Sequence, residues 1–70
     1  MRISARNQLN GTVVDVVKGA TTAHIRIDIG GGAIVTAAIT NAAVDDLGLA
    51  KGKPATAVIK ASDVMVAVDH

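Results

Sequence analysis

The amino-acid sequence predicts an all-β fold, a small barrel with one short helix. Three features of the 70-residue chain lead to this prediction. Several segments alternate apolar and polar residues with a period of two, which is typical of half-buried strands. These segments are rich in the β-branched residues that favour strands. Glycine-containing stretches, where turns are expected, separate them.

In the first half of the chain we expect two long strands and a turn. Residues 12–17 (TVVDVV) are mostly β-branched, and residues 22–29 carry isoleucine at every second position from 25 to 29. Gly30-Gly31-Gly32 then predicts a hairpin turn. A phosphate-binding loop is a poorer reading, because the Walker spacing and its following helix are missing. Residues 2–5 are expected to add a short strand.

The second half of the chain contains the one expected helix. After a strand over residues 33–40, Asn41 is suited to cap a short helix over residues 42–47, and Gly48 is suited to end it. Two strands over residues 55–60 and 64–68 complete the chain. This order predicts a five-stranded OB-like Greek-key barrel, with residues 1–70 as a single domain. An SH3-like barrel is the nearest alternative.

The composition predicts self-association. Half of the residues are hydrophobic, yet the chain contains no aromatic residue and no cysteine. A domain of this size buries only about 60% of its unfolded surface, so it is marginally stable alone. Disulfides are excluded, and two histidines far apart in the sequence are too few for a structural metal centre. Contacts with further copies of the chain are the remaining source of stability.

Several functional classes fit the sequence poorly. A net charge of +1 and the lack of aromatic residues argue against a nucleic-acid-binding barrel. No apolar run approaches the ~20 residues of a membrane span, and the start, MRISARNQ, lacks the apolar segment of a signal peptide, so we expect a cytoplasmic protein. No nucleophile and base stand in a catalytic pattern, and His24 is expected to be a surface residue, so we expect no enzyme activity.

Two polar clusters flank the apolar strands. The second contains Lys60 and Ser62, and the first contains Arg2, Ser4, Arg6, Asn7 and Gln8. A tetrahedral dianion presents only acceptors, so its site must present donors such as guanidinium, ammonium, hydroxyl and backbone N–H groups. The clusters supply these groups. From composition alone, however, ordinary surface polarity explains them better.

Three blocks of sequence resemble the molbindins, the free-standing Mop domains related to TOBE modules. Residues 4–11 (SARNQLNG) resemble the family's S-A-R-N-Q-L-x-G opening. Residues 39–49 (ITNAAVDDLGL) resemble its I-[ST]-x-x-[SA]-V-x-x-L-G-[LV] segment, and residues 56–65 (TAVIKASDVM) resemble its T-A-[VI]-I-K-[SA]-[ST]-[DN]-V-[MI] segment. The three blocks cover nearly the whole chain in order and with matching spacing.

The resemblance implies a homohexamer, a trimer of dimers, that binds molybdate or tungstate between subunits and uses no organic cofactor. It implies storage or homeostasis of the oxyanion, with no nucleic-acid or membrane partner. The donors that it implies are Ser4, Arg6, Lys60, Ala61 and Ser62 from one subunit and Thr40 from the adjoining subunit. Many relatives have Ser where this chain has Ala61, so one hydroxyl is lost unless Ser62 replaces it.

Other readings remain open at the level of sequence. The resemblance implies further sites near the threefold axis with mainly backbone donors, for which the turn over residues 18–22 is a candidate. The chain could instead be a regulatory module that senses the oxyanion and acts through a partner protein. A nucleic-acid-binding OB domain is a more remote alternative.

Overall fold

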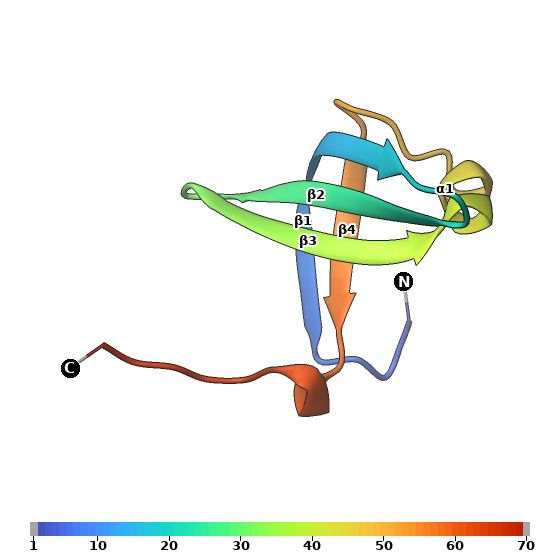
Figure 1. Cartoon of the computed structure of the whole chain (residues 1–70). Coiled ribbons are helices and arrows are strands. Elements are labelled where there is room, and N and C mark those ends of the chain that lie inside the picture. Colours follow the sequence, from blue (N-terminus) through green and yellow to red (C-terminus); the bar gives the residue numbers. More distant parts are fainter. Residues whose placement is uncertain (1, 70) are drawn as a thin grey trace.

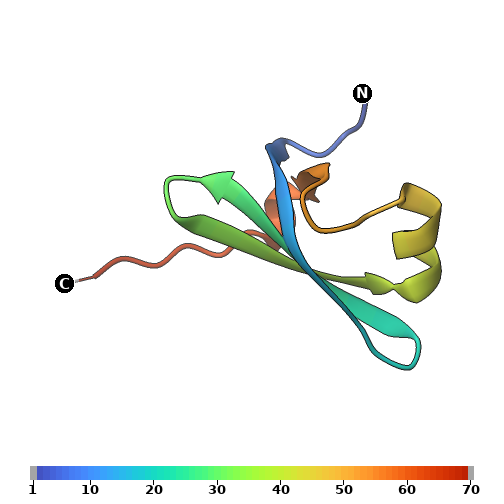
Figure 2. The same cartoon turned by 90° about the horizontal axis from the view of Figure 1, so that it is seen from above.

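The computed structural model describes residues 2–69. A four-stranded antiparallel sheet with the order β3-β2-β1-β4 forms its body. The sheet curls on itself, with a short helix beyond the end of β3 (Figures 1 and 2). The elements, in chain order, are β1 (Asn7–Lys18), β2 (Thr22–Gly30), β3 (Ala33–Thr40), α1 (Asn41–Leu47), β4 (Pro54–Ile59) and the 3₁₀ turn η1 (Ala61–Asp63).

β1 is the long strand that joins both halves of the sheet. Its first half pairs with β4 over residues 7–12, and its second half pairs with β2 over residues 12–18. A β-bulge between Val13 and Asp15 separates the two halves. Inward-facing positions are odd-numbered up to Val13 and even-numbered from Val14 onward, as the burial pattern shows. The bulge therefore bends β1 and changes its phase, so that both halves face one interior.

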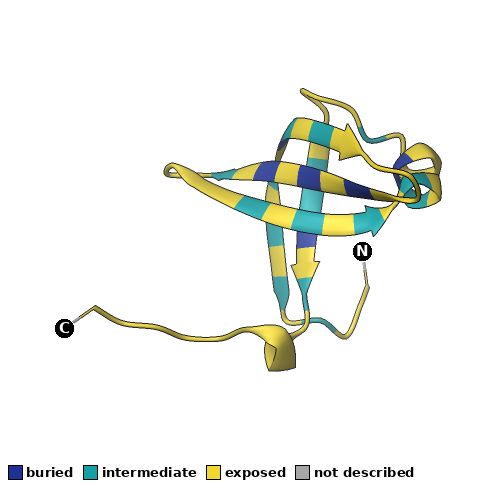
Figure 3. Ribbon diagram, in the orientation of Figure 1, coloured by how far each residue is buried: buried dark blue, intermediate teal, exposed yellow. Residues whose placement is uncertain are grey.

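The interior is made of small and β-branched side chains. Figure 3 shows the alternation of buried and exposed residues along β2, which is the most buried strand. The buried core among the described residues consists of Val13, Ala23, Ile25, Ile27, Val44 and Ala57. Gly11 allows β1 and β2 to approach closely, since a Cβ there would lie 2.3 Å from the carbonyl oxygen of Asp28.

α1 begins one residue earlier than predicted, ends at the predicted residue and has a different N-cap. The residue expected as the cap, Asn41, is the first helical residue, and the cap is Thr40, whose Oγ1 accepts a hydrogen bond from the N–H of Ala43 at 3.1 Å. Asn41 instead donates through Nδ2 to the carbonyl of Gly19 at 3.0 Å, and through its backbone N–H to the carbonyl of Thr21 at 2.8 Å. Gly48 ends α1 in the left-handed conformation, as predicted.

The structure confirms the expected all-β fold with one short helix. Among the described residues the sheet has four strands instead of the predicted five. Residues 64–68 run as an extended segment with no neighbouring strand in the described part of the chain, and residues 2–5 form no strand (Figure 1). In turn, β1 begins at Asn7 instead of Thr12, because residues 7–11 pair with β4 despite their weak strand propensity. Within residues 2–69, no helix is long enough to cross a membrane.

Candidate anion-binding site

The N-terminal polar block and the end of β4 lie side by side. β1 and β4 are antiparallel, and Asn7 is the register partner of Ile59. The side-chain amide of Asn7 also donates to the carbonyl of Ile59 at 3.1 Å. Ser4 and Arg6 therefore enter β1 at the same edge of the sheet where Lys60 leaves β4, near the lower end of the sheet in Figure 1.

This edge gathers five of the six predicted donors. We call this group the donor cluster; its members are Ser4, Arg6, Lys60, Ala61 and Ser62. All five are exposed to solvent. Among residues 2–69, neither cationic member forms a salt bridge. The cluster thus presents charged heads that are not neutralised by carboxylates of the described chain.

η1 adds backbone donors to the cluster. The N–H of Asp63 bonds to the carbonyl of Lys60 at 2.9 Å, and that of Val64 bonds to the carbonyl of Ala61 at 3.2 Å. Within the described residues, the N–H groups of Ala61 and Ser62 make no backbone hydrogen bond. Ala61 can therefore contribute its N–H although it lacks the hydroxyl found in many relatives, and Ser62 carries a hydroxyl one residue later.

The sixth predicted donor, Thr40, lies elsewhere in the same chain. It ends β3, where its register partner is Thr22, close to the C-terminal end of β1. The donor cluster lies at the N-terminal end of β1, so the 12 residues of this strand separate the two places. One chain therefore does not bring Thr40 to the donor cluster.

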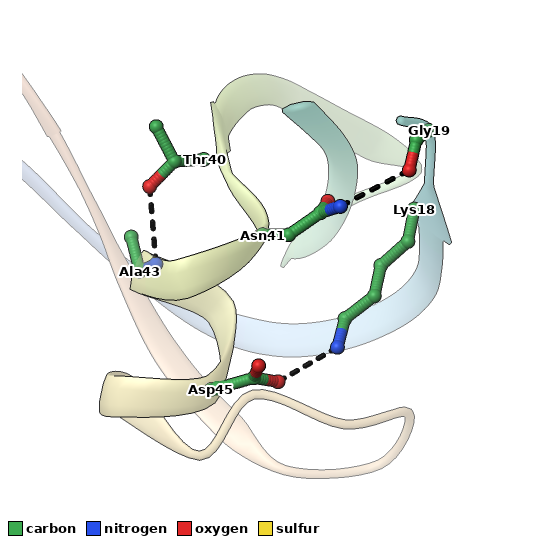
Figure 4. Close-up of polar contacts among 6 residues, drawn as sticks. All are labelled: Lys18, Gly19, Thr40, Asn41, Ala43 and Asp45. Atoms are coloured by element: carbon green, nitrogen blue, oxygen red, sulfur yellow. Dashed lines mark hydrogen bonds and ion pairs between the residues drawn. The ribbon is translucent and has the colours of Figure 1, made fainter. Parts of the chain in front are cut away.

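The hydroxyl of Thr40 still has a proton to donate. Its oxygen accepts from the N–H of Ala43, as Figure 4 shows. A hydroxyl can accept and donate at the same time. Thr40 is exposed, so its O–H can reach a ligand outside its own chain.

The turn between β1 and β2 is tied to the start of α1. Lys18 forms a salt bridge of 2.7 Å with Asp45, and the side-chain amide of Asn41 donates a hydrogen bond to the carbonyl of Gly19 (Figure 4). The N–H of Gly19 bonds to the carbonyl of Thr22 at 2.8 Å. The ammonium of Lys18 and this N–H are therefore already engaged within the chain.

The donor set fits a tetrahedral oxyanion. Guanidinium, ammonium, hydroxyl and N–H groups all donate, and hydrogen bonds to a charged acceptor are the stronger ones. His24 lies apart from these groups, exposed on β2 opposite Val17 and Ala38. Among the described residues, the arrangement offers binding groups for an anion at the edge of a sheet.

Sequence reasoning did not single out one residue that shapes this site. Asn7 was counted among the polar residues of the first cluster, but its amide fastens the start of β1 to the last carbonyl of β4. Its position directly after Arg6 in the SARNQ block was the available signal. Only the pairing of β1 with β4 shows what the amide contacts.

Comparison with known proteins finds relatives along nearly the whole chain. The model of the TOBE domain family matches residues 3–66. A probable molybdenum-pterin-binding protein of Haemophilus influenzae is 51% identical over 69 residues, which cover 99% of this chain and 100% of that protein.

Two solved structures are similar in fold as well as in sequence. A molybdate-binding protein from Sporomusa ovata superimposes with a TM-score of 0.90 at 43% identity, covering 97% of this chain and 100% of its own. The cytoplasmic molybdate-binding protein ModG, solved with molybdate bound, gives a TM-score of 0.89 at 46% identity. That match covers 93% of this chain and 46% of ModG.

Proposed function

Since this chain belongs to the TOBE domain family and to its molybdenum-pterin-binding (Mop) proteins, we propose that it binds molybdate through the donor cluster. The observation that carries this proposal is the pairing of Asn7 with Ile59, which gathers Ser4 and Arg6 beside residues 60–62. Every group so gathered can donate to an oxyanion, and the anion is taken up and released without chemical change.

Thr40 is proposed to complete the site from an adjoining subunit. It is remote from the donor cluster of its own chain, yet it is exposed and retains a free O–H. A homohexamer built as a trimer of dimers would supply it. Because donors then come from two chains, ligand binding and assembly are coupled, and molybdate stabilises the oligomer.

The biological role that we propose is storage or homeostasis of the oxyanion in the cytoplasm, with the whole chain acting as one binding module. Tungstate has the same charge and nearly the same shape as molybdate, so the donor cluster is expected to accept both. Sulfate is smaller, so a site that fits molybdate is expected to pair fewer of its donors with sulfate and to bind it more weakly.

Calorimetric titration of the purified protein with molybdate, tungstate, sulfate and phosphate tests this proposal. Native mass spectrometry of the same samples gives the number of subunits and of bound anions. We expect saturable binding of molybdate and tungstate at micromolar levels or below, and weaker binding of sulfate and phosphate. No heat with molybdate, or equal affinity for all four anions, contradicts the proposal.

A further inference from the structure

We propose that Asn10-Gly11 is a modification site, at which the paired sheet prevents deamidation and separation of β1 from β4 permits it. In this reaction a bond forms between the backbone nitrogen of Gly11 and Cγ of Asn10. The bond from Cγ to Nδ2 breaks, and Nδ2 leaves as ammonia with the proton of the Gly11 N–H. Water then opens the succinimide ring to give aspartate or isoaspartate. The inference rests on the proposed function only in its consequence for anion binding.

Asn10 is the asparagine of this chain that precedes a glycine. The other two, Asn7 and Asn41, precede larger residues. A glycine nitrogen is the least hindered nucleophile for this ring closure, because glycine has no Cβ and turns freely. Asn-Gly pairs are also typical of tight hairpin turns, but this pair lies inside the 12-residue strand β1. The fold therefore holds the most reactive asparagine of the chain in an extended conformation.

Pairing with β4 opposes ring closure. In the register of β1 and β4, Asn10 lies opposite Thr56, and Gly11 lies opposite Ala55. Ring closure requires the Gly11 nitrogen to turn toward the Asn10 side chain, far from the ψ of about +135° that is typical of antiparallel strands. Such a rotation changes the direction of the chain and breaks the pairing at these two positions. The reaction therefore requires β1 to separate locally from β4.

Gly11 is confined on its other side by β2. A Cβ built on Gly11 would lie 2.3 Å from the carbonyl oxygen of Asp28 and 2.8 Å from Cγ2 of Ile27, so β1 and β2 are in close contact here. Gly11 also has no positive φ, unlike the glycines of the hairpin between β2 and β3. The conformational freedom that makes glycine a good reaction partner is therefore not used in the folded chain.

A side-chain hydrogen bond holds the amide of Asn10 toward β4. Its Oδ1 accepts from the hydroxyl of Thr56 at 2.9 Å. Asn10 is exposed, so water can reach the amide, and burial does not protect it. The protection comes from the paired backbone and from this hydrogen bond, which both join β1 to β4. Both are lost together when the two strands separate.

Isoaspartate at position 10 would disturb the donor cluster. In isoaspartate the main chain runs through Cβ and Cγ, so β1 gains one carbon atom at this position. The part of β1 that precedes it can then no longer keep its register with β4. The pair of Asn7 with Ile59 would be lost, and Arg6 would shift relative to Lys60. Deamidation during unfolding would therefore yield chains that bind molybdate poorly after refolding.

Peptide mapping of the purified protein tests this inference. Samples are held in mildly alkaline buffer with and without guanidinium chloride, and mass spectrometry then measures deamidation in the tryptic peptides. We expect Asn10 to react at least about tenfold more slowly in the folded protein, because only the locally opened state reacts. In denaturant, Asn10 should react faster than Asn7 and Asn41, which serve as internal controls. Equal rates for Asn10 in both conditions, or for all three asparagines in denaturant, would overturn the inference.

Thr56→Val tests the role of β4 in the folded protein. It removes the hydroxyl that binds Asn10 and nearly keeps the shape of the side chain. We expect Asn10 to deamidate roughly two- to tenfold faster in the folded variant, as for the loss of one hydrogen bond, and at an unchanged rate in denaturant. Thr36→Val, at an exposed position of β3, is the matched control and should change neither rate. An unchanged rate in folded Thr56→Val contradicts protection by β4.

The reaction products separate this inference from the proposed function. Ion exchange isolates refolded chains with the new carboxylate, and enzymatic methylation identifies the isoaspartate form. We expect this form to bind molybdate at least about tenfold more weakly than Asn10→Asp, whose main chain has the normal length, because the shift of Arg6 removes a charged hydrogen bond. Equal affinities would overturn the consequence for the donor cluster.

Molybdate titration of the unmodified protein is read independently. If it shows no binding but Asn10 reacts only after unfolding, the proposed function fails and the modification site stands. Molybdate binding together with equally fast deamidation of Asn10 in the folded protein overturns the modification site alone.

Discussion

The side-chain amide of Asn7 donates a 3.1 Å hydrogen bond to the carbonyl of Ile59, 52 residues later in the chain. This contact lies at the register pair that ends the pairing of β1 with β4. Arg6 directly precedes this pair in the chain, and Lys60 directly follows it. It therefore ties together the strand ends from which the N-terminal donors and those of η1 extend.

Removing this amide is expected to weaken molybdate binding without removing a proposed ligand. Asn7→Ala loses one hydrogen bond, worth about 0.5–1.5 kcal/mol, so affinity should fall by roughly two- to tenfold. Asn10→Ala is the control, because Asn10 joins the same two strands by a 2.9 Å bond with Thr56, farther from the cluster. Equal effects of both variants in calorimetry would mean that Asn7 acts only on general stability.

Replacement of Arg6 tests the main cationic donor. Hydrogen bonds to charged groups contribute about 1.5–3 kcal/mol, so Arg6→Ala should weaken molybdate binding by roughly 10- to 150-fold. Arg6→Lys keeps the charge but not the planar fork of donors, and an intermediate loss is expected. Arg26→Ala, on the exposed face of β2, serves as the charge-matched control. Binding by Arg6→Ala at the wild-type affinity would remove Arg6 from the site.

Thr40 has two roles that one substitution can separate. In Thr40→Asp the carboxylate can still accept from the N–H of Ala43, so the cap is kept, but the O–H donor is lost and a negative charge faces the anion. We expect nearly unchanged thermal stability together with loss of molybdate binding. Thr40→Ser, which keeps both functions, should bind normally. If Thr40→Asp binds as well as the wild type, Thr40 does not contact the anion.

Gly11 is expected to tolerate no side chain. A Cβ at this position would lie 2.3 Å from the carbonyl oxygen of Asp28 and 2.8 Å from Cγ2 of Ile27. Gly11→Ala must push β1 and β2 apart, and overpacking of this kind costs about 1–3 kcal/mol. Urea unfolding gives the change in the free energy of unfolding. Thr12→Ala, at the next and exposed position of β1, should have a much smaller effect.

The parts of the fold that sequence predicted well are those whose signals are local. The strand over residues 33–40 has the predicted bounds, and the strand predicted over residues 22–29 ends one residue later, at Gly30. The hairpin between these strands follows from three consecutive glycines, all with positive φ. Periodicity and glycine content depend on neighbouring residues only, so they can be read without knowing the fold.

The errors concern features that depend on distant residues. Residues 7–11 contain Asn, Gln and Gly, which favour strands little, and only β4 makes them a strand. Residues 64–68 have strong strand propensity but pair with no strand among residues 2–69. The capping difference is smaller: Asn41 and Thr40 are both good caps, and the contact of Asn41 with Gly19 decides between them.

The candidate site was predictable in composition but not in arrangement. The motifs supplied Ser4, Arg6 and residues 60–62, and the pairing of β1 with β4 brings these residues to one edge of the sheet. Sequence could not place Thr40 relative to them, because its distance depends on the length and curvature of β1. The absence of salt bridges at Arg6 and Lys60 within residues 2–69 likewise required coordinates.

The phase change at the β-bulge restricts how the length of this chain can vary. Deleting one residue from the segment around Val13 and Asp15 would remove the bulge and with it the local bend of β1, which lets one strand pair with both β4 and β2 in the curled sheet. At the glycine hairpin between β2 and β3, by contrast, added residues would disturb no packed side chain. Insertions and deletions among related chains should therefore be frequent at the hairpin and rare at the bulge.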